Sequence, residues 1–304
     1  MSPVAPALRK VLVSGSSGLV GSALVPALTS GGYEVTRLVR SGPSGLGRLA
    51  WDPNGPLAPA TLSGFDALVH LAGESIVGRW TEEKKRRIVD SRVLPTRYLA
   101  EAAAKTLPSL RVFICASAIG YYGDRGDEIL REDSSPGARF SSELCVQWES
   151  ACKATVAAGI RTVNLRLGIV LSSTGGALKR MLPPFRLGVG GNMGSGRQWM
   201  SWVDLDDVTA AIVHILKTES LHGPVNMTAP NPVTNAVFTK TLASVLSRPA
   251  VFPMPEFAAR LLFGQMAEEL LLASQRVEPA KLLAGGYKFL RADLQQSLQA
   301  ILRK

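Results

Sequence analysis

Short apolar runs alternate with longer stretches that carry apolar residues at helical spacing over the first half of the chain. The short runs are typical of buried strands, and the longer stretches are typical of amphipathic helices. The predicted strands are residues 10–14, 34–39, 48–51, 67–71, 111–116 and 162–167. The longest predicted helices between them are residues 81–105 and 142–158. Strands joined through helices pair in parallel by right-handed crossovers, so the pattern predicts a doubly wound α/β fold.

This pattern changes after residue 167. Residues 172–201 contain seven glycines together with Pro183, Pro184 and Trp199, and this composition is too apolar and aromatic for a solvated linker. We expect the stretch to be a substrate-facing loop. Beyond it, Asp206 or Asp207 is predicted to cap a helix that runs to residue 217. A short strand at 225–227 and helices at 235–246, 255–263, 265–274 and 292–302 follow.

The sequence therefore predicts two units. The first comprises residues 1–170, with a return segment at about 201–230, and it contains the parallel sheet. The second comprises the loop at 171–200 and residues 231–304, and it is a smaller, mostly helical C-terminal substrate domain.

Three glycines lie between the first predicted strand and the helix after it. In a dinucleotide-binding turn, one glycine makes the tight turn, one lets the pyrophosphate approach the backbone, and one lets helix and strand pack closely. The pyrophosphate then rests on free N–H groups at the helix N-terminus. An ordinary strand–helix turn is the alternative, but the strand–turn–helix context favours a Rossmann-type cofactor site. The residues expected at the cofactor are Gly15, Ser16, Ser17, Gly18, Leu19, Val20 and Gly21.

The end of the second strand distinguishes NAD from NADP, because an acid there holds the ribose 2′-OH and an arginine accommodates a 2′-phosphate. The strand ends at Val39-Arg40 and carries no acid at that point. A guanidinium binds phosphate bidentately, so we predict NADP (NADPH), with a plain surface arginine as the alternative. Further cofactor contacts are expected after the third and fourth strands, at Asp52, Leu71, Ala72, Gly73 and Glu74.

The composition limits the classes of partner. Of 304 residues, 46% are hydrophobic and 19% are charged, which indicates a globular protein. The net charge of +10 suggests an anionic partner, but the densest charged cluster, residues 82–87, mixes acids with bases. A phosphorylated cofactor is a sufficient anion, and we expect no nucleic-acid partner.

Cysteines and histidines are few and scattered. Three cysteines without a close pair and three separated histidines predict neither a disulfide framework nor a metal site, and they favour a reducing compartment. No apolar run is long enough to cross a bilayer, and the residues before Val11 lack the apolar core of a signal peptide. We therefore expect a cytoplasmic protein without a membrane partner.

Several short motifs together resemble the extended short-chain dehydrogenases/reductases, and most closely their atypical epimerase-like subgroup. The motifs are Gly15-x-x-Gly18-x-x-Gly21, Leu71-Ala72-Gly73, Ser91-Arg92, residues 117–123, Trp148-Glu149, residues 166–171, and residues 183–185 leading to 194–199. The resemblance covers nearly the whole chain, and it implies NADP binding and epimerase or reductase activity on a small polar molecule, such as a nucleotide sugar. It also implies cofactor contacts at Arg92, Ala116, Leu167 and Gly168, and substrate contacts at Tyr121, Gln198, Trp199 and Trp202.

The chain departs from that family at its proton-transfer pair, Tyr-x-x-x-Lys. Counted back from Glu149, the two positions hold Ser141 and Cys145, and neither residue type can do the work of that pair. Ser117 matches the position of the family's catalytic serine. Tyr122 is the candidate substitute acid, and an aromatic ring that packs against a bound ligand is the alternative.

Two functions therefore stay open. The first is an NADP-dependent oxidoreductase or epimerase that acts on an unidentified small polar substrate. The second is a catalytically inactive NADP-binding sensor or regulator. The oligomeric state is open as well, and a homodimer is the assembly that the two helices used for pairing in this superfamily would form.

Overall fold

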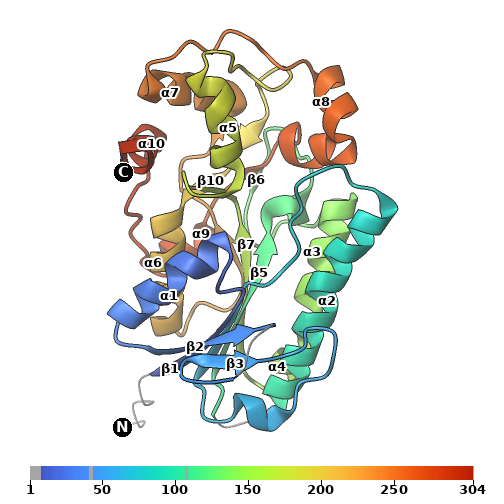
Figure 1. Ribbon diagram of the computed structural model, residues 1–304, viewed down its shortest axis with the longest axis vertical. Coiled ribbons are helices and arrows are strands. Elements are labelled where there is room, and N and C mark those ends of the chain that lie inside the picture. Colours follow the sequence, from blue (N-terminus) through green and yellow to red (C-terminus); the bar gives the residue numbers. More distant parts are fainter. Residues whose placement is uncertain (1–7, 41–43, 107–108, 304) are drawn as a thin grey trace.

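Seven parallel strands form the central sheet, in the spatial order β11-β7-β5-β4-β1-β2-β3 (Figure 1). The computed structural model describes residues 8–40, 44–106 and 109–303, so most of the segment in which no signal peptide is expected lies outside the described residues. The strands are β1 (Lys10–Ser14), β2 (Glu34–Val39), β3 (Arg48–Ala50), β4 (Ala67–His70), β5 (Val112–Ala118), β7 (Arg161–Leu167) and β11 (Gly223–Met227). All seven predicted strands, including the short one at 225–227, are present within two residues of their predicted ends, and the Rossmann-type sheet is confirmed.

The direction in which the chain builds this sheet reverses between β1 and β4. From β1 the chain moves outward to β2 and β3, and it then returns to β4 on the other side of β1. At such a reversal the loops leaving the two strands diverge and open a crevice outside the carboxyl ends of the strands. The loops that begin at Gly15 and Leu71 border this crevice.

Helices cover both faces of the sheet. On one face lie α1 (Leu19–Ser30) and α6 (Leu205–Lys217), and on the other lie α2 (Glu82–Ala104), α3 (Phe140–Ser150) and α4 (Lys153–Ala157) (Figure 1). Successive strand residues point to opposite faces, so Val11 and Val13 belong to the core under α1 and α6, while Leu12 belongs to the core under α2. The two-sided burial explains why the strands read as continuous apolar runs.

The prediction of one continuous helix over residues 142–158 is wrong. A turn at Ala151 and Cys152 separates α3 from α4. The Thr155 hydroxyl donates to the carbonyl of Cys152 over 2.7 Å, and this side-chain bond competes with regular helical bonding.

The C-terminal region builds a second core around Trp202, which is fully buried. Helices α5 (Gly176–Arg186), α7 (Asn235–Leu246) and α10 (Leu294–Arg303) surround it. The remaining helices are α8 (Glu256–Phe263), α9 (Ala280–Ala284), a π-helical turn (Ala267–Leu271) and two 3-10 turns (Pro59–Leu62 and Ile119–Tyr122). Three small two-stranded sheets pair β8 (Ile169–Leu171) with β10 (Trp202–Asp204), β9 (Trp199–Met200) with β12 (Val233–Thr234), and β6 (Ile129–Leu130) with β13 (Arg276–Val277). The exact division of the chain into two domains stays a prediction.

Helix α5 corrects the prediction that residues 172–201 form a loop throughout. Leu178, Leu182 and Phe185 recur at helical spacing and pack into the second core. The free energy gained by burying these side chains outweighs the helical hydrogen bonds lost at Pro183 and Pro184.

The predicted cap of α6 is also wrong. Asp204 is the capping residue, and its carboxylate accepts a 2.9 Å hydrogen bond from the N–H of Asp206. The fully buried Asp207 instead accepts hydrogen bonds from the Tyr287 hydroxyl and from the N–H of Leu290. The sequence alone does not distinguish these aspartates, because Asp207 acquires its partners from a segment 80 residues away.

Candidate functional site

The turn after β1 is closed by backbone contacts that leave no room for a side chain at Gly15 or Gly21. Gly15 has φ +68°, and a Cβ on it would lie 2.6 Å from the carbonyl carbon of Leu71. A Cβ on Gly21 would lie 2.2 Å from the carbonyl oxygen of Gly15, and one on Gly18 would lie 3.3 Å from that same oxygen. These contacts bring α1 against the strand end, as a dinucleotide-binding turn requires.

Helix α1 begins with its N–H groups available. Gly18 is the capping residue, and within the described residues no side chain caps this helix and no acid lies in its first turn. Free N–H groups and the helix dipole make such an N-terminus favourable for a phosphate. The predicted contacts Ser16, Ser17, Leu19 and Val20 lie in or beside this first turn.

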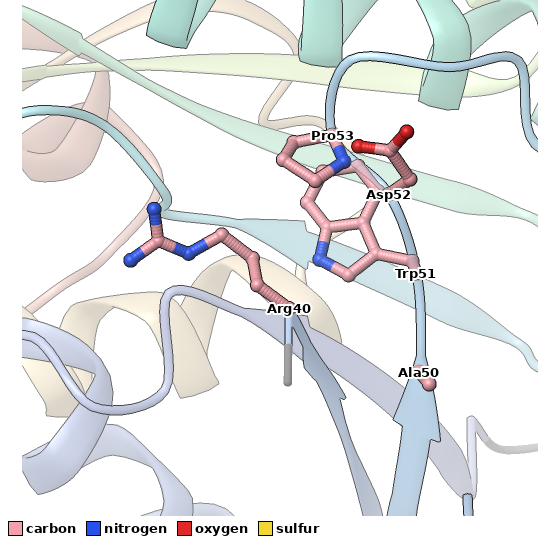
Figure 2. A pocket seen from close by; sticks show the side chains of 5 residues that line it. All are labelled: Arg40, Ala50, Trp51, Asp52 and Pro53. Carbon is pink, nitrogen blue, oxygen red and sulfur yellow. The ribbon is translucent and has the colours of Figure 1, made fainter. Parts of the chain in front are cut away.

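An open pocket of about 440 Å³ lies at the ends of β2 and β3 (Figure 2). Arg40, Ala50, Trp51, Asp52 and Pro53 line it. Figure 2 shows Arg40 and Asp52 on opposite sides of the pocket, with the Trp51 and Pro53 rings between them. The structure therefore places Arg40 and Asp52, two of the predicted cofactor contacts, at the same pocket, and Val39 ends the strand that precedes Arg40.

The loop after β4 is held by two adjacent residues of α2. The N–H of Glu74 donates to Ser91 Oγ over 3.0 Å, and Arg92 Nη2 donates to the carbonyl of Glu74 over 2.9 Å. Gly73 packs against this guanidinium, since a Cβ there would lie 3.1 Å from Arg92 Cζ. A 2.7 Å hydrogen bond from Lys84 and the lysine charge lower the pKa of Glu74. The loop is fixed where its backbone faces the crevice, and Ala72 lies within it.

Arg92 itself is folded inward. Its guanidinium donates to the carbonyl of Ile88 and lies 5.1 Å from the ring of Trp148. Burial lowers the pKa of Arg92 to about 10. Its role in this structure is to hold the loop, and a contact of Arg92 with a cofactor phosphate stays a prediction.

Ser117 belongs to a buried cluster of polar side chains. Its hydroxyl donates to Glu149 Oε1 over 2.8 Å, and Arg166 binds the same carboxylate through Nε at 2.9 Å and Nη2 at 3.0 Å. Burial lowers the pKa of Arg166, but the hydrogen bonds and charge of Glu149 outweigh that effect and raise it above its ordinary value. Ser117 lies on β5, Arg166 on β7 and Glu149 on α3. The three side chains meet near the carboxyl ends of β5 and β7.

Arg166 is not among the site residues predicted from the sequence, and Glu149 enters that prediction only as the residue from which the Tyr-x-x-x-Lys positions are counted. Arg166 lies within a family motif, but nothing local marks it as a partner of Ser117. The feature that reveals Arg166 as a neighbour of Ser117 is the sheet register, which pairs these two residues on adjacent strands.

Tyr122 is fully buried and contacts this cluster through Arg166. Its hydroxyl donates to Asn226 Oδ1 over 2.6 Å and accepts from Arg166 Nη1 over 2.9 Å. Burial raises the pKa of Tyr122 to about 12. With both hydrogen-bonding roles filled, this hydroxyl is not presented to a ligand, so the interpretation of Tyr122 as the substitute acid loses support. Tyr121 stacks on Arg166, with 3.4 Å between its ring centre and the guanidinium carbon.

The positions of the missing family pair hold buried residues. Burial raises the pKa of the Cys145 thiol to about 11, which keeps it protonated at neutral pH. Ser141 is buried, and its N–H donates to Glu269 Oε2 over 2.8 Å.

The predicted substrate residues beyond β7 have different environments. Trp202 is wrong as a substrate contact, because it fills the second core and its indole N–H donates to the carbonyl of Asn231. Gln198 is also buried, and its amide donates to the carbonyls of Met193 and Leu271. Trp199 is half-buried beneath Arg276, with 4.4 Å between the guanidinium carbon and the ring centre, and it stays a prediction.

The remaining predicted cofactor residues lie at the ends of β5 and β7. Ala116 is buried in β5, and Leu167 ends β7. A Cβ on Gly168 would lie 2.5 Å from the carbonyl oxygen of Ser201, so the chain crosses here at close range. Their contacts with a cofactor stay predictions.

Two further observations concern metals and membranes. Within residues 8–40, 44–106 and 109–303, no group of three or more histidine, cysteine, aspartate or glutamate side chains is arranged to hold a metal ion. Among the helices of that same part of the chain, none has the length and apolar character needed to span a bilayer.

Comparison with known proteins identifies the family. Residues 11–227 match the model of the NAD dependent epimerase/dehydratase family, and residues 254–301 match a domain of unknown function, DUF1731. An epimerase family protein of Mycobacterium tuberculosis is 42% identical over 281 residues, which are 92% of this chain and 93% of that protein.

Two solved structures extend the comparison. The human epimerase family protein SDR39U1, crystallised with NADPH, superposes with a TM-score of 0.90 and 34% identity over 97% of this chain and 99% of that one. The nucleoside-diphosphate sugar epimerase from Corynebacterium glutamicum gives a TM-score of 0.81 and 40% identity over 98% of this chain and 58% of that one. The fold, the glycine turn and these matches lead to one conclusion: the chain is a member of the NAD dependent epimerase/dehydratase family.

Proposed function

We propose that this protein binds NADPH in the crevice and acts as a reductase or epimerase on a small polar substrate. The observation that carries the proposal is Arg40, which stands at the end of β2 in place of an acid and lines an open pocket with Asp52. The NADPH in the human relative supports the same cofactor. When bound, this cofactor supplies or accepts the hydride.

The glycine turn fits a pyrophosphate, because helix α1 begins there with no side-chain cap and no acid in its first turn, within the part of the chain that the structure describes. In this proposal the N–H groups at the start of α1 hold the pyrophosphate, Arg40 holds the 2′-phosphate, and Asp52 accepts from the adenine amino group. Ser117, which lies near the carboxyl end of β5, contacts the substrate in this proposal. The cytoplasm is the proposed location, because the three cysteines are free thiols.

Calorimetric titration of the purified protein with NADPH and with NADH tests the cofactor. We expect tighter binding of NADPH. Tighter binding of NADH would contradict the hypothesis that Arg40 binds the 2′-phosphate. The reaction is tested by following NADPH absorbance in the presence of a panel of sugars, aldehydes and ketones. Binding without turnover of any of them would support the alternative, an NADPH-binding regulator.

A further inference from the structure

One carboxylate, that of Glu149, connects Ser117 to Arg166. Ser117 and Arg166 are register partners on β5 and β7, and α3 lies over them and carries Glu149. Oε1 of Glu149 accepts from Ser117 Oγ and from Arg166 Nε, and Oε2 accepts from Arg166 Nη2. Ser117 is 2% exposed, and its hydrogen is directed at the carboxylate, so a ligand that reaches this hydroxyl meets an oxygen lone pair.

Arg166 holds this carboxylate in one orientation. The guanidinium is itself fixed by the Tyr122 hydroxyl, by the carbonyl of Glu132 at 3.2 Å, and by stacking on Tyr121. Its side chain is 3% exposed, whereas that of Glu149 is 13% exposed. The acid is therefore the more exposed member of the ion pair. A buried ion pair contributes little net stability compared with apolar packing, so stability alone does not account for it.

Other candidate groups near Ser117 are unsuited to accept a proton. The Cys145 thiol stays protonated, and the Tyr122 hydroxyl is buried with both roles filled. Glu149 lies four residues beyond Cys145 and eight beyond Ser141 on α3, so it shares their helix face. It thus stands one turn from the position of the missing lysine.

We propose that Ser117 and Glu149 form the proton relay of this site and replace the missing tyrosine–lysine pair. In the oxidative direction, the substrate hydroxyl gives its proton to Ser117 Oγ, and Ser117 gives its own proton to Glu149 Oε1. The substrate carbon loses its hydride to the bound cofactor, so an alcohol becomes a carbonyl and the carboxylate becomes a carboxylic acid. In the reductive direction each transfer is reversed. This inference rests on the proposed function.

The relay is tested with Ser117→Ala, Glu149→Gln and the double variant, in the NADPH assay with the substrate panel. We expect kcat to fall by about 10²- to 10⁴-fold in each single variant, with KM and NADPH affinity changed by less than about threefold. Because two members of one relay act as a unit, the double variant should be no slower than the slower single variant. Glu143→Gln, an exposed change on the same helix, is the matched control and should retain the wild-type kcat.

A second comparison separates the relay from a structural role. Glu149→Gln leaves Arg166 buried without its carboxylate and should lower Tm. Adding Arg166→Met removes the unpaired charge and should restore Tm without restoring kcat. If kcat returns together with Tm, Glu149 is structural and the relay is overturned.

The remaining outcomes distinguish this inference from the proposed function. Turnover that persists in Glu149→Gln overturns the relay and leaves the proposed function intact. A wild-type protein that binds NADPH but turns over no member of the panel contradicts both the relay and the proposed reaction. A wild-type protein that does not bind NADPH contradicts the proposed cofactor.

Discussion

Gly15 and Leu71, which follow different strands, meet through their backbones: a Cβ on Gly15 would lie 2.6 Å from the carbonyl carbon of Leu71. This contact lies where the order of the strands reverses, between β1 and β4. It joins the glycine turn to the loop that Ser91 and Arg92 hold in place. The two sides of the crevice are therefore one packed unit.

Replacing Gly15 with alanine should break this unit. Its φ of +68° strains any side chain, and the added Cβ meets rigid backbone. We expect the free energy of unfolding to fall by about 2–5 kcal/mol and NADPH binding to be lost. Urea unfolding and calorimetry measure the two effects. Gly45→Ala is the control, because nothing lies within 4 Å of a Cβ at that position, and equal losses in both variants would contradict the argument.

Replacing Arg40 with alanine should weaken NADPH binding selectively. A charged hydrogen bond contributes about 1.5–3 kcal/mol, which corresponds to about a 10- to 100-fold rise in Kd. NADH lacks the 2′-phosphate, so its Kd should stay unchanged. Titration of both cofactors checks this, with the exposed Arg37→Ala as the control. Parallel weakening of NADPH and NADH would show that Arg40 does not contact the 2′-phosphate.

Replacing Tyr122 with phenylalanine should destabilise the fold. The change leaves Asn226 Oδ1 and Arg166 Nη1 short of a buried partner, at a cost of about 1–3 kcal/mol. Tyr98→Phe is the matched control, since Tyr98 is half-buried on α2, away from this cluster, and should leave Tm nearly unchanged. If Tyr122→Phe keeps the wild-type Tm but abolishes turnover, Tyr122 is the catalytic acid after all.

His70 should make the protein sensitive to mild acid. Burial, together with the positive charge of Arg92, lowers the pKa of His70 from 6.5 to about 3. Between these two pH values the unfolded chain binds a proton at His70 and the folded protein does not, so the free energy of unfolding falls as the pH falls through this range. Urea unfolding at pH 7 and pH 4.5 should show a smaller loss in His70→Gln than in the wild type. An equal loss in both proteins would exclude His70 as the source.

The strands and the glycine turn can be predicted from the sequence because they depend on residues close together in the chain. The apolar run that ends at Ser14, followed directly by glycines, specifies a strand, a turn and a helix without knowledge of distant partners. The place of Arg40 at the pocket is predictable for the same reason, since it follows from the position of this residue at a strand end.

The cluster around Ser117 is not predictable in this way. Glu149 lies 32 residues from Ser117 and 17 from Arg166, and only the sheet register and the packing of α3 bring the three together. Trp202, predicted to contact substrate, instead lies in a core, and the sequence could not reveal this either. A glycine-rich and aromatic sequence is as compatible with a core as with a binding loop, and the partners that decide between them lie on α7 and α10.

The core around Trp202 has a consequence for the order in which a newly made chain can fold. It takes residues from Leu171 to Ile301, whereas the contact between Gly15 and Leu71 needs only the first quarter of the chain. During synthesis the glycine turn can form early, while the face of α7 against which α10 packs stays uncovered until α10 leaves the ribosome. The interval between these two events is when the nascent protein is most exposed to aggregation.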